Sequence, residues 1–409
     1  MKYKRTQIMK HVALSACFAY TLLVSCKPEG PQPTPEPTPP VPPKADQVDL
    51  GLAQRYSVEW LQTLKLTPKG SFESVTWTLT DPNGKAEELG NLPSYLFFAR
   101  DKGSYRLAIT AHQNGKEARN EITLEVIDEK TPYKRNPVRV LSFRPAPGQF
   151  VNVLPEATAS NSEEELRTRA EAAFTGKTTT LISLGAFGGS LVFAFDHPVV
   201  NRAGKDFVIF GNARSLYNNP GANDAEPGCV WVAKDSNGNG IPDDDEWFEL
   251  AGSEQNNPQT IHNYRVTYFR PTAEPATSAD SARYIRWEDN QGQTGYIPKN
   301  KYHAQAYYPL WIKEDSYVLS GTRLPNNAIE RNGIYTLPNF AFGYVDNYPN
   351  SSEDARLDID WAVDAQGNKV TLDRIDFIKV VSGLQQVCGP IGETSTEVLG
   401  AADLHIPKR

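Results

Sequence analysis

The sequence has few cysteines, and their positions limit what they can do. Four occur in 409 residues, and Cys17 and Cys26 both precede the strand-like part of the chain. Only Cys229 and Cys388 remain for a folded region, which excludes a disulfide-rich scaffold and a cysteine metal cluster. These two are compatible with one disulfide or with two buried thiols.

Basic charge is also in short supply. The chain has 42 Lys and Arg residues against 49 Asp and Glu residues, for a net charge of −7. Residues 1–25 hold four of the basic residues and none of the acidic ones, so without them the net charge falls to about −11. Nucleic acid is held by clustered basic charge, and this composition argues against it as a partner.

The apolar run that begins at Val12 is shorter than the roughly 20 residues of a membrane-spanning helix. It follows a basic start and ends in Leu23-Val24-Ser25-Cys26. Basic start, apolar middle and small residues predict a signal peptide over residues 1–25. The last four residues resemble the lipobox of bacterial lipoproteins, which implies that Cys26 is lipidated. An ordinary signal peptide followed by a chance cysteine is the alternative.

A proline-rich segment follows Cys26. Residues 28–43 hold nine prolines, separated mainly by Thr, Glu and Gln. Such a sequence favours extended polyproline II at about 3.1 Å per residue and cannot form a core. Residues 26–45 are therefore predicted to be a lipidated stalk that holds a folded body off a membrane.

Catalytic signatures are missing from the rest of the chain. There is no Gly-x-Ser-x-Gly and no His-Glu-x-x-His, and the histidines are scattered. Glu393 and Glu397 lie four residues apart, but nothing in the sequence marks them as a glycosidase pair. We predict a protein that is not an enzyme and that uses no organic cofactor.

Residues 46–129 alternate between apolar and polar positions in short runs. Four runs predict strands, with Asp-Pro-Asn-Gly at 81–84 and Asn-Gly at 114–115 as turns. The four runs are Tyr56–Trp60, Val75–Leu79, Tyr105–Ile109 and Ile122–Val126. Short strands with regular turns are typical of a β-sandwich. The segment resembles a PKD-type, immunoglobulin-like domain, a kind that most often serves as a spacer.

A link at residues 130–137 leads to a larger region, 136–409, that is also mostly strand-like. Its predicted strands are Val138–Phe143, Ser190–Phe195, Phe207–Phe210, Cys229–Lys234, Trp247–Leu250, Tyr264–Arg270, Tyr284–Glu288, Tyr317–Leu319, Asp358–Val363, Lys369–Leu372 and Ile375–Val381. Only Ser162–Phe174 predicts a helix, with Ser162 as its N-cap and three acids in the first turn. No repeat of fixed period is present, which argues against a propeller. The predicted fold class is all-β: a PKD/immunoglobulin-like sandwich followed by a larger jelly-roll-like sandwich.

The segment from Asp235 to Glu246 has the spacing of a calcium-binding loop. Oxygen-bearing side chains stand at positions 1, 3, 5, 9 and 12, and a glycine stands at position 6. The predicted ligands are Asp235, Asn237, Asn239, the Ile241 carbonyl, Asp243 and Glu246. Strand-like flanks and Pro242 also fit the alternative, an Asn-Gly-rich hairpin without metal.

Aromatic residues stand beside amides in several expected loops of the larger region. Flat rings next to hydrogen-bonding groups suit a large ligand with apolar faces and polar edges. The alternative for any one ring is ordinary core packing. The predicted ligand contacts are Tyr307, Tyr308, Trp311, Tyr344, Tyr348 and His303.

Several segments in order carry a resemblance of the larger region to surface lipoproteins of gut Bacteroidetes. They include Pro145–Asn152, Ser183–Gly189, Phe195–His197, Glu249–Glu254 and Gly392–Val398. Some such proteins are similar to cobamide-capturing lipoproteins that assist an outer-membrane vitamin B12 transporter. The resemblance implies an outer-membrane lipoprotein facing the cell exterior, which binds a cobamide and passes it to a TonB-dependent transporter. Glycan binding is the alternative, and a glycoside hydrolase is the rival from another class.

Overall fold

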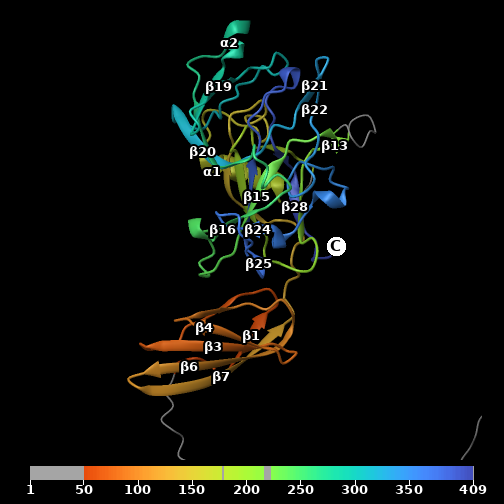
Figure 1. Cartoon of the computed structure of the whole chain (residues 1–409). Coiled ribbons are helices and arrows are strands. Elements are labelled where there is room, and N and C mark those ends of the chain that lie inside the picture. Colours follow the sequence, from red (N-terminus) through yellow and green to blue (C-terminus); the bar gives the residue numbers. More distant parts are fainter. Residues whose placement is uncertain (1–49, 177–178, 216–222, 409) are drawn as a thin grey trace, which may run out of the picture. The chain divides into compact units, whose positions relative to one another are not determined.

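The computed structural model describes residues 50–176, 179–215 and 223–408. The predicted signal peptide, the lipidation site Cys26 and the stalk lie outside the described residues. Within the described part, no helix combines the length and the apolar character needed to cross a membrane. Strands in several sheets make up most of the regular structure, so the predicted all-β sandwich class is confirmed (Figure 1).

The first sheet has five strands, in the spatial order β1-β7-β6-β3-β4. Their bounds are β1 (Arg55–Glu59), β7 (Lys116–Ile127), β6 (Gly103–Gln113), β3 (Ser74–Thr80) and β4 (Ala86–Asn91). Strand β1 runs parallel to β7, and the other pairs are antiparallel. A separate pair joins β2 (Leu64–Leu66) to β5 (Tyr95–Phe97).

The sequence pattern explains this sheet. Alternate residues such as Trp77, Leu107 and Ile122 are fully buried in one hydrophobic cluster, as period-two strands require. The β6–β7 hairpin turns at Asn114 and Gly115, both with positive φ, which is the conformation that Asn-Gly favours. The four predicted strands coincide with parts of β1, β3, β6 and β7, except that Trp60 lies one residue beyond the end of β1.

The larger region is organised around two antiparallel sheets and a smaller third one. The six-stranded sheet has the order β24 (Ala362–Val363), β16 (Trp247–Leu250), β15 (Gly228–Ala233), β26 (Phe377–Ser382), β10 (Ser190–Ala194) and β8 (Arg139–Arg144). The four-stranded sheet has the order β19 (Thr294–Ile297), β18 (Ile285–Asp289), β17 (Ile261–Phe269) and β20 (Ser316–Arg323). The three-stranded sheet has the order β23 (Arg356–Leu357), β12 (Phe207–Phe210) and β28 (Gly400–Asp403).

Short pairs and helices complete this region. The pairs are β11 (Val199–Val200) with β25 (Arg374–Ile375), β13 (Arg214–Ser215) with β14 (Asn223–Asp224), β21 (Ile329–Arg331) with β22 (Ile334–Thr336), and β9 (Ile182–Ser183) with β27 (Glu397–Val398). The helices are α1 (Glu163–Phe174) and α2 (Ser278–Ala282), with 3-10 turns η2 (Asp244–Glu246), η3 (Glu353–Ala355), η4 (Ile359–Trp361) and η5 (Gly389–Ile391).

One large hydrophobic cluster lies beneath these elements. Val230 and Val232 of β15, Val266 of β17 and Phe207 of β12 all belong to it. Because strand residues alternate between faces, Cys229, Trp231 and Ala233 of β15 lie on the opposite face of the six-stranded sheet. That second face carries the groove described below.

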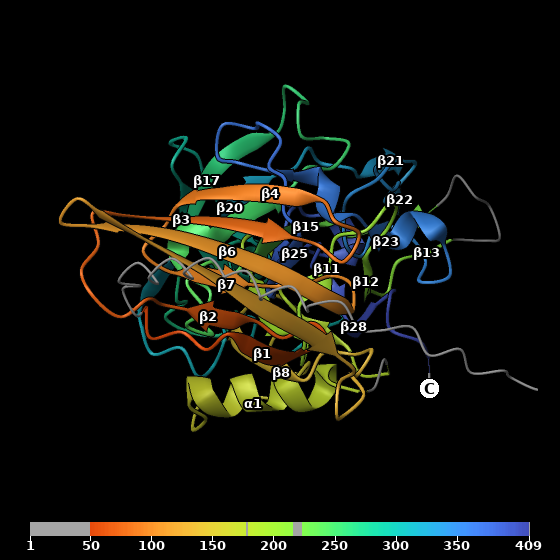
Figure 2. The same cartoon turned by 90° about the horizontal axis from the view of Figure 1, so that it is seen from below.

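Helix α1 forms where the sequence predicts it. Ser162 caps its N-terminus and forms a capping box with Glu165. The helix packs beside β8 (Figure 2), and Arg167 donates to the Val140 carbonyl while Glu171 accepts from the Val140 N–H. Leu166, with its buried apolar side chain, joins the main cluster.

Two predicted strands are wrong. The sequence predicts a strand over 358–363, but Ile359–Trp361 form the 3-10 turn η4 and only Ala362–Val363 are strand. The Asp358 side chain caps this turn by accepting from the Asp360 N–H, which outweighs the β propensity of the apolar run. Residues 369–372 are predicted as a strand but make only an isolated bridge, between Val363 and Lys369.

Candidate functional site

A groove of about 760 Å³ opens where the six-stranded and four-stranded sheets meet. Strands β15, β16, β17, β20 and β26 all contribute to its wall. Its lining has one indole among many polar groups: Trp231, Glu249, Gln255, Asn256, His262, Asn263, Arg265, Asn290, Ser320, Gly321, Thr322, Asp364, Ala365, Gln366, Gly367 and Lys379. A concave site with one aromatic surface and converging amides and charges is the usual form of a binding site for a polar ligand.

Three lining residues form one row across adjacent strands. Trp231 of β15 is paired with Glu249 of β16 on one side and with Lys379 of β26 on the other. Residues at paired positions project from the same face of a sheet, so the three side chains stand next to one another. The same face is apolar on both sides of the row, in one cluster with Ala233 and Phe377 and in another with Cys229.

Glu249 is almost completely buried, at 6% exposed. The Thr322 hydroxyl donates to Glu249 Oε2 at 2.7 Å, which satisfies one carboxyl oxygen. Burial raises the pKa of Glu249, while the hydrogen bond from Thr322 and the charge of His262 lower it. The net direction is upward, so Glu249 holds its proton to a higher pH than an exposed glutamate does.

Lys379 lies between two indole rings. Its Nζ is 5.2 Å from the centre of the Trp231 ring and 4.4 Å from that of Trp247. Burial lowers the pKa of Lys379, and the nearby charges of Asp244 and Glu249 raise it. Within the described residues its ammonium forms no ion pair, and both indole rings face its charge.

Trp231 itself is half-buried and has an unsatisfied donor. Its Nε1–H is buried without a hydrogen-bond acceptor among the described residues. Buried donors in folded proteins are nearly always paired, so this indole N–H is an exception in the wall of the groove.

A β-bulge shapes the opposite wall. The register of β17 against β20 shifts between Ile261 and Tyr264, and Asn263 has a φ of 54°. Such bulges redirect side chains at sheet edges and near functional sites. Here both His262 and Asn263 line the groove, and Asn290 donates to the Asn263 carbonyl at 3.0 Å.

The six residues predicted as ligand contacts lie elsewhere, and none lines this groove. Tyr307, Tyr308, Trp311 and Tyr344 are at most 3% exposed and pack in the hydrophobic clusters. Tyr348 packs beside Val208 and Ala355, and His303 packs edge-on against Phe150. The four buried rings offer almost no surface to a ligand, so core packing accounts for them, and a role in binding stays a prediction.

The predicted calcium loop is closed by its own hydrogen bonds. Asp235 accepts from the backbone N–H groups of residues 238, 239 and 240, as the first residue of such a loop does. Glu246 accepts from the N–H groups of Ser236 and Asp243.

Not all of the predicted ligands of this loop present oxygen atoms inward. Asn237 and Asn239 turn their amide N–H groups toward Asp243, so both amides would have to rotate for their oxygens to reach a cation. In the described residues, no group of three or more His, Cys, Asp or Glu side chains is arranged to hold a metal ion. Calcium binding therefore stays a prediction.

Glu393 and Glu397, four residues apart in the sequence, are both buried. Glu393 accepts from the Gln149 N–H at 2.5 Å, and Asn212 donates its amide N–H to Glu397. Burial raises the pKa of each carboxyl to about 8, and it raises that of nearby Asp346 to about 7. At 2% and 5% exposed, Glu393 and Glu397 have almost no surface for a substrate.

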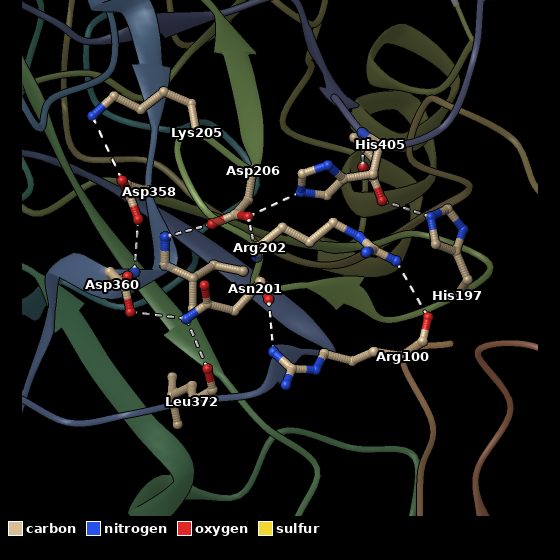
Figure 3. A network of polar contacts seen from close by, with 12 residues as sticks. Arg100, His197, Asn201, Arg202, Lys205, Asp206, Asp358, Asp360, Leu372 and His405 are labelled. Carbon is tan, nitrogen blue, oxygen red and sulfur yellow. Dashed lines mark hydrogen bonds and ion pairs between the residues drawn. The ribbon is translucent and has the colours of Figure 1, made fainter. Parts of the chain in front are cut away.

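A further polar network holds the C-terminal strand. His405 faces Asp206 at 2.9 Å (Figure 3), and the buried His197 ring lies between Asp196 at 2.8 Å and Asp403 at 2.9 Å. Asp206 also accepts from the N–H of Arg202. These contacts join residues 403–405 to the segment around β12, which gives the network a structural role.

The sequence does not single out Trp231, Glu249 and Lys379, although it places all three in predicted strands. The available signal is a single charged residue inside an apolar run, as in Trp247–Leu250 and in Phe377–Val381. Cys229 and Cys388 are both free and buried, so they do not form a disulfide.

Comparison with known proteins adds little. No family model matches the chain, and no curated protein does. A solved structure described as "SusE-like protein BT2857" aligns over 84% of this chain and 94% of that chain, with a TM-score of 0.23 and 8% sequence identity. A similarity of that size carries no argument about this chain.

Proposed function

We propose that this chain is a lipid-anchored surface protein of the outer membrane that captures a glycan. In this proposal the anchor is Cys26, and a TonB-dependent transporter in the same membrane receives the ligand. The observation that carries the proposal is the groove, in which the half-buried indole of Trp231 is surrounded by amides, hydroxyls and charges.

Sugar rings have the matching chemistry. Their C–H faces pack on an indole, and their hydroxyls exchange hydrogen bonds with amides and charged groups. Asn263, Gln255 and Gln366 offer such amides in the groove. A cobamide has broad apolar faces, which one indole in a mainly polar groove serves less well. Cobamide capture stays a prediction from the resemblance of the sequence motifs.

Calorimetry on the protein without its signal peptide tests this function. The probes are a panel of oligosaccharides, neutral and acidic, and cyanocobalamin. We expect heat with at least one oligosaccharide, and Trp231→Ala should weaken that binding by about tenfold or more because stacking on the ring is lost. Tyr302→Ala is the matched control, since it removes an exposed ring outside the groove.

The outcomes separate the alternatives. If cyanocobalamin gives heat and no saccharide does, the ligand of this protein is a cobamide and not a glycan. If the unmodified protein and the Trp231→Ala variant bind the oligosaccharide with equal affinity, the glycan site lies outside this groove. Cleavage of a bound oligosaccharide, followed by chromatography, would make the protein an enzyme.

A further inference from the structure

We propose that the glycan bound in this groove is anionic and carries a carboxylate or a sulfate ester that pairs with Lys379. The inference rests on the proposed function and adds the charge of the ligand to it. It comes from the distribution of charge around the Trp231 row.

Lys379 is the first reason. It is a half-buried cation in the wall of a groove, and no carboxylate of the described residues forms an ion pair with it. Burying an ammonium group without a counter-charge costs free energy, which is why buried charges are normally paired. The two indole rings near Nζ offset only part of that cost. An anion supplied by the ligand would complete the pair.

The two carboxyl groups in the groove do not supply this charge. Glu249 is bonded to Thr322, and its burial favours the neutral form by raising its pKa. Asp364 closes its own turn, where it accepts from the N–H groups of Gln366 and Asn368 and from the Asn368 amide. Both carboxyl groups are thus held by hydrogen bonds within the protein.

The opposite wall adds a second cation. Arg265 is exposed on β17, lines the groove and forms no ion pair with a described residue. Its guanidinium is always charged and suits the planar geometry of a carboxylate or the oxygens of a sulfate. With Lys379 on one wall, Arg265 on the other and the Trp231 ring beside them, the groove fits a sugar ring that bears a negative group.

Matched pairs of saccharides that differ only in charge test this inference. Tetragalacturonic acid is compared with its methyl ester, and sulfated cellotetraose with cellotetraose, by calorimetry on the protein without its signal peptide. We expect at least one acidic member to bind about tenfold or more tightly than its neutral partner. The carboxylate and sulfate pairs together distinguish the two kinds of anion.

Variants locate the effect. Lys379→Gln should remove most of the preference for the acidic member, and Arg265→Gln should reduce it. Lys116→Gln removes the same charge from the exposed β6–β7 hairpin and should leave binding unchanged. Circular dichroism and the melting temperature confirm that each variant is folded, so a loss of binding is not a loss of structure.

Two results would overturn the inference in distinguishable ways. If acidic and neutral members bind equally, and Trp231→Ala weakens both, the groove is a glycan site but not an anionic one. If no saccharide of either kind binds the folded protein, the proposed function fails together with this inference.

Discussion

Thr322 on β20 donates its hydroxyl to Glu249 on β16 across 2.7 Å, and this bond joins the four-stranded sheet to the six-stranded sheet beside the groove. Both residues are buried, and Cys229 of β15, the strand next to β16, donates its thiol to the Thr322 carbonyl. Hydrogen bonds in the wall of the groove therefore connect the two sheets.

Removing the Thr322 hydroxyl should weaken this connection between the two sheets. Thr322→Val keeps the side-chain shape but leaves a buried carboxyl of Glu249 without its donor, which we expect to cost about 1–3 kcal/mol in the free energy of unfolding. The pKa of Glu249 should rise further, because the hydrogen bond lowers it. Urea unfolding at neutral pH measures the loss. Thr322→Ser keeps the hydroxyl and is the control; equal losses in both variants would show that the bond is not important.

Stability should fall as pH rises from about 4 to about 8, and these groups should add no further loss above that. Burial raises the pKa of Asp346 to about 7 and those of Glu393 and Glu397 to about 8 in the folded state. Unfolded carboxyls titrate near about 4, so between these values the folded state binds more protons than the unfolded state. The free energy of unfolding then decreases with pH across this window, because the contribution is complete below about 4 and is lost through pH 7–8.

A melting series from pH 5.5 to 8.5 checks this expectation. Glu393→Gln imitates the protonated side chain, so the variant should lose part of the fall in melting temperature. Glu163→Gln, on the exposed first turn of α1, should melt with the same pH dependence as the unmodified protein. A melting temperature that stays constant or rises toward pH 8.5 would contradict the raised pKa values.

Calcium should stabilise the folded protein if the Asp235–Glu246 loop binds it. In metal-stripped protein we expect the melting temperature to rise with calcium and to return to its starting value with a chelator, because a ligand that binds only the folded state stabilises it. Asp235→Asn should abolish the response. Asp364→Asn is the control, since Asp364 closes a similar turn outside this loop. No response in the unmodified protein would leave the loop as an Asn-Gly-rich hairpin.

Replacing Cys26 should detach the protein from membranes. Cys26→Ala removes the thiol that lipidation requires, so the variant should fractionate with soluble protein, while Cys17→Ala should still be anchored. Membrane fractionation and immunoblotting measure the difference. If Cys26→Ala stays with the membrane, residues 1–25 are an anchor of another kind.

The sequence predicts the fold class well because local signals agree with the final structure. The alternation of apolar and polar residues predicts β6 and β7, and Asn114-Gly115 predicts the turn between them. Ser162 predicts the start of α1. It fails at Ile359–Trp361, where a capping aspartate turns an apolar run into a 3-10 turn.

The candidate site is harder to predict from sequence. Tyr307 and Trp311 are expected in a loop, yet both are core residues, because a long irregular segment has no periodic pattern from which burial can be predicted. The row of Glu249, Trp231 and Lys379 depends on the register of three strands that are far apart in the chain. Only the pairing of those strands brings the row together.

The position of the last strands has a consequence for how the chain matures. Strands β26, β27 and β28 follow the other described strands in the chain, yet they pair with β10, β9 and β12 from the beginning of the larger region. Strand β26 also fills the centre of the six-stranded sheet, between β15 and β10. Until β26 has been synthesised, β10 has only β8 as a neighbour in this sheet and β15 has only β16, and contacts between such distant segments form slowly. A chain halted before β26 therefore has two separate groups of strands in place of one six-stranded sheet.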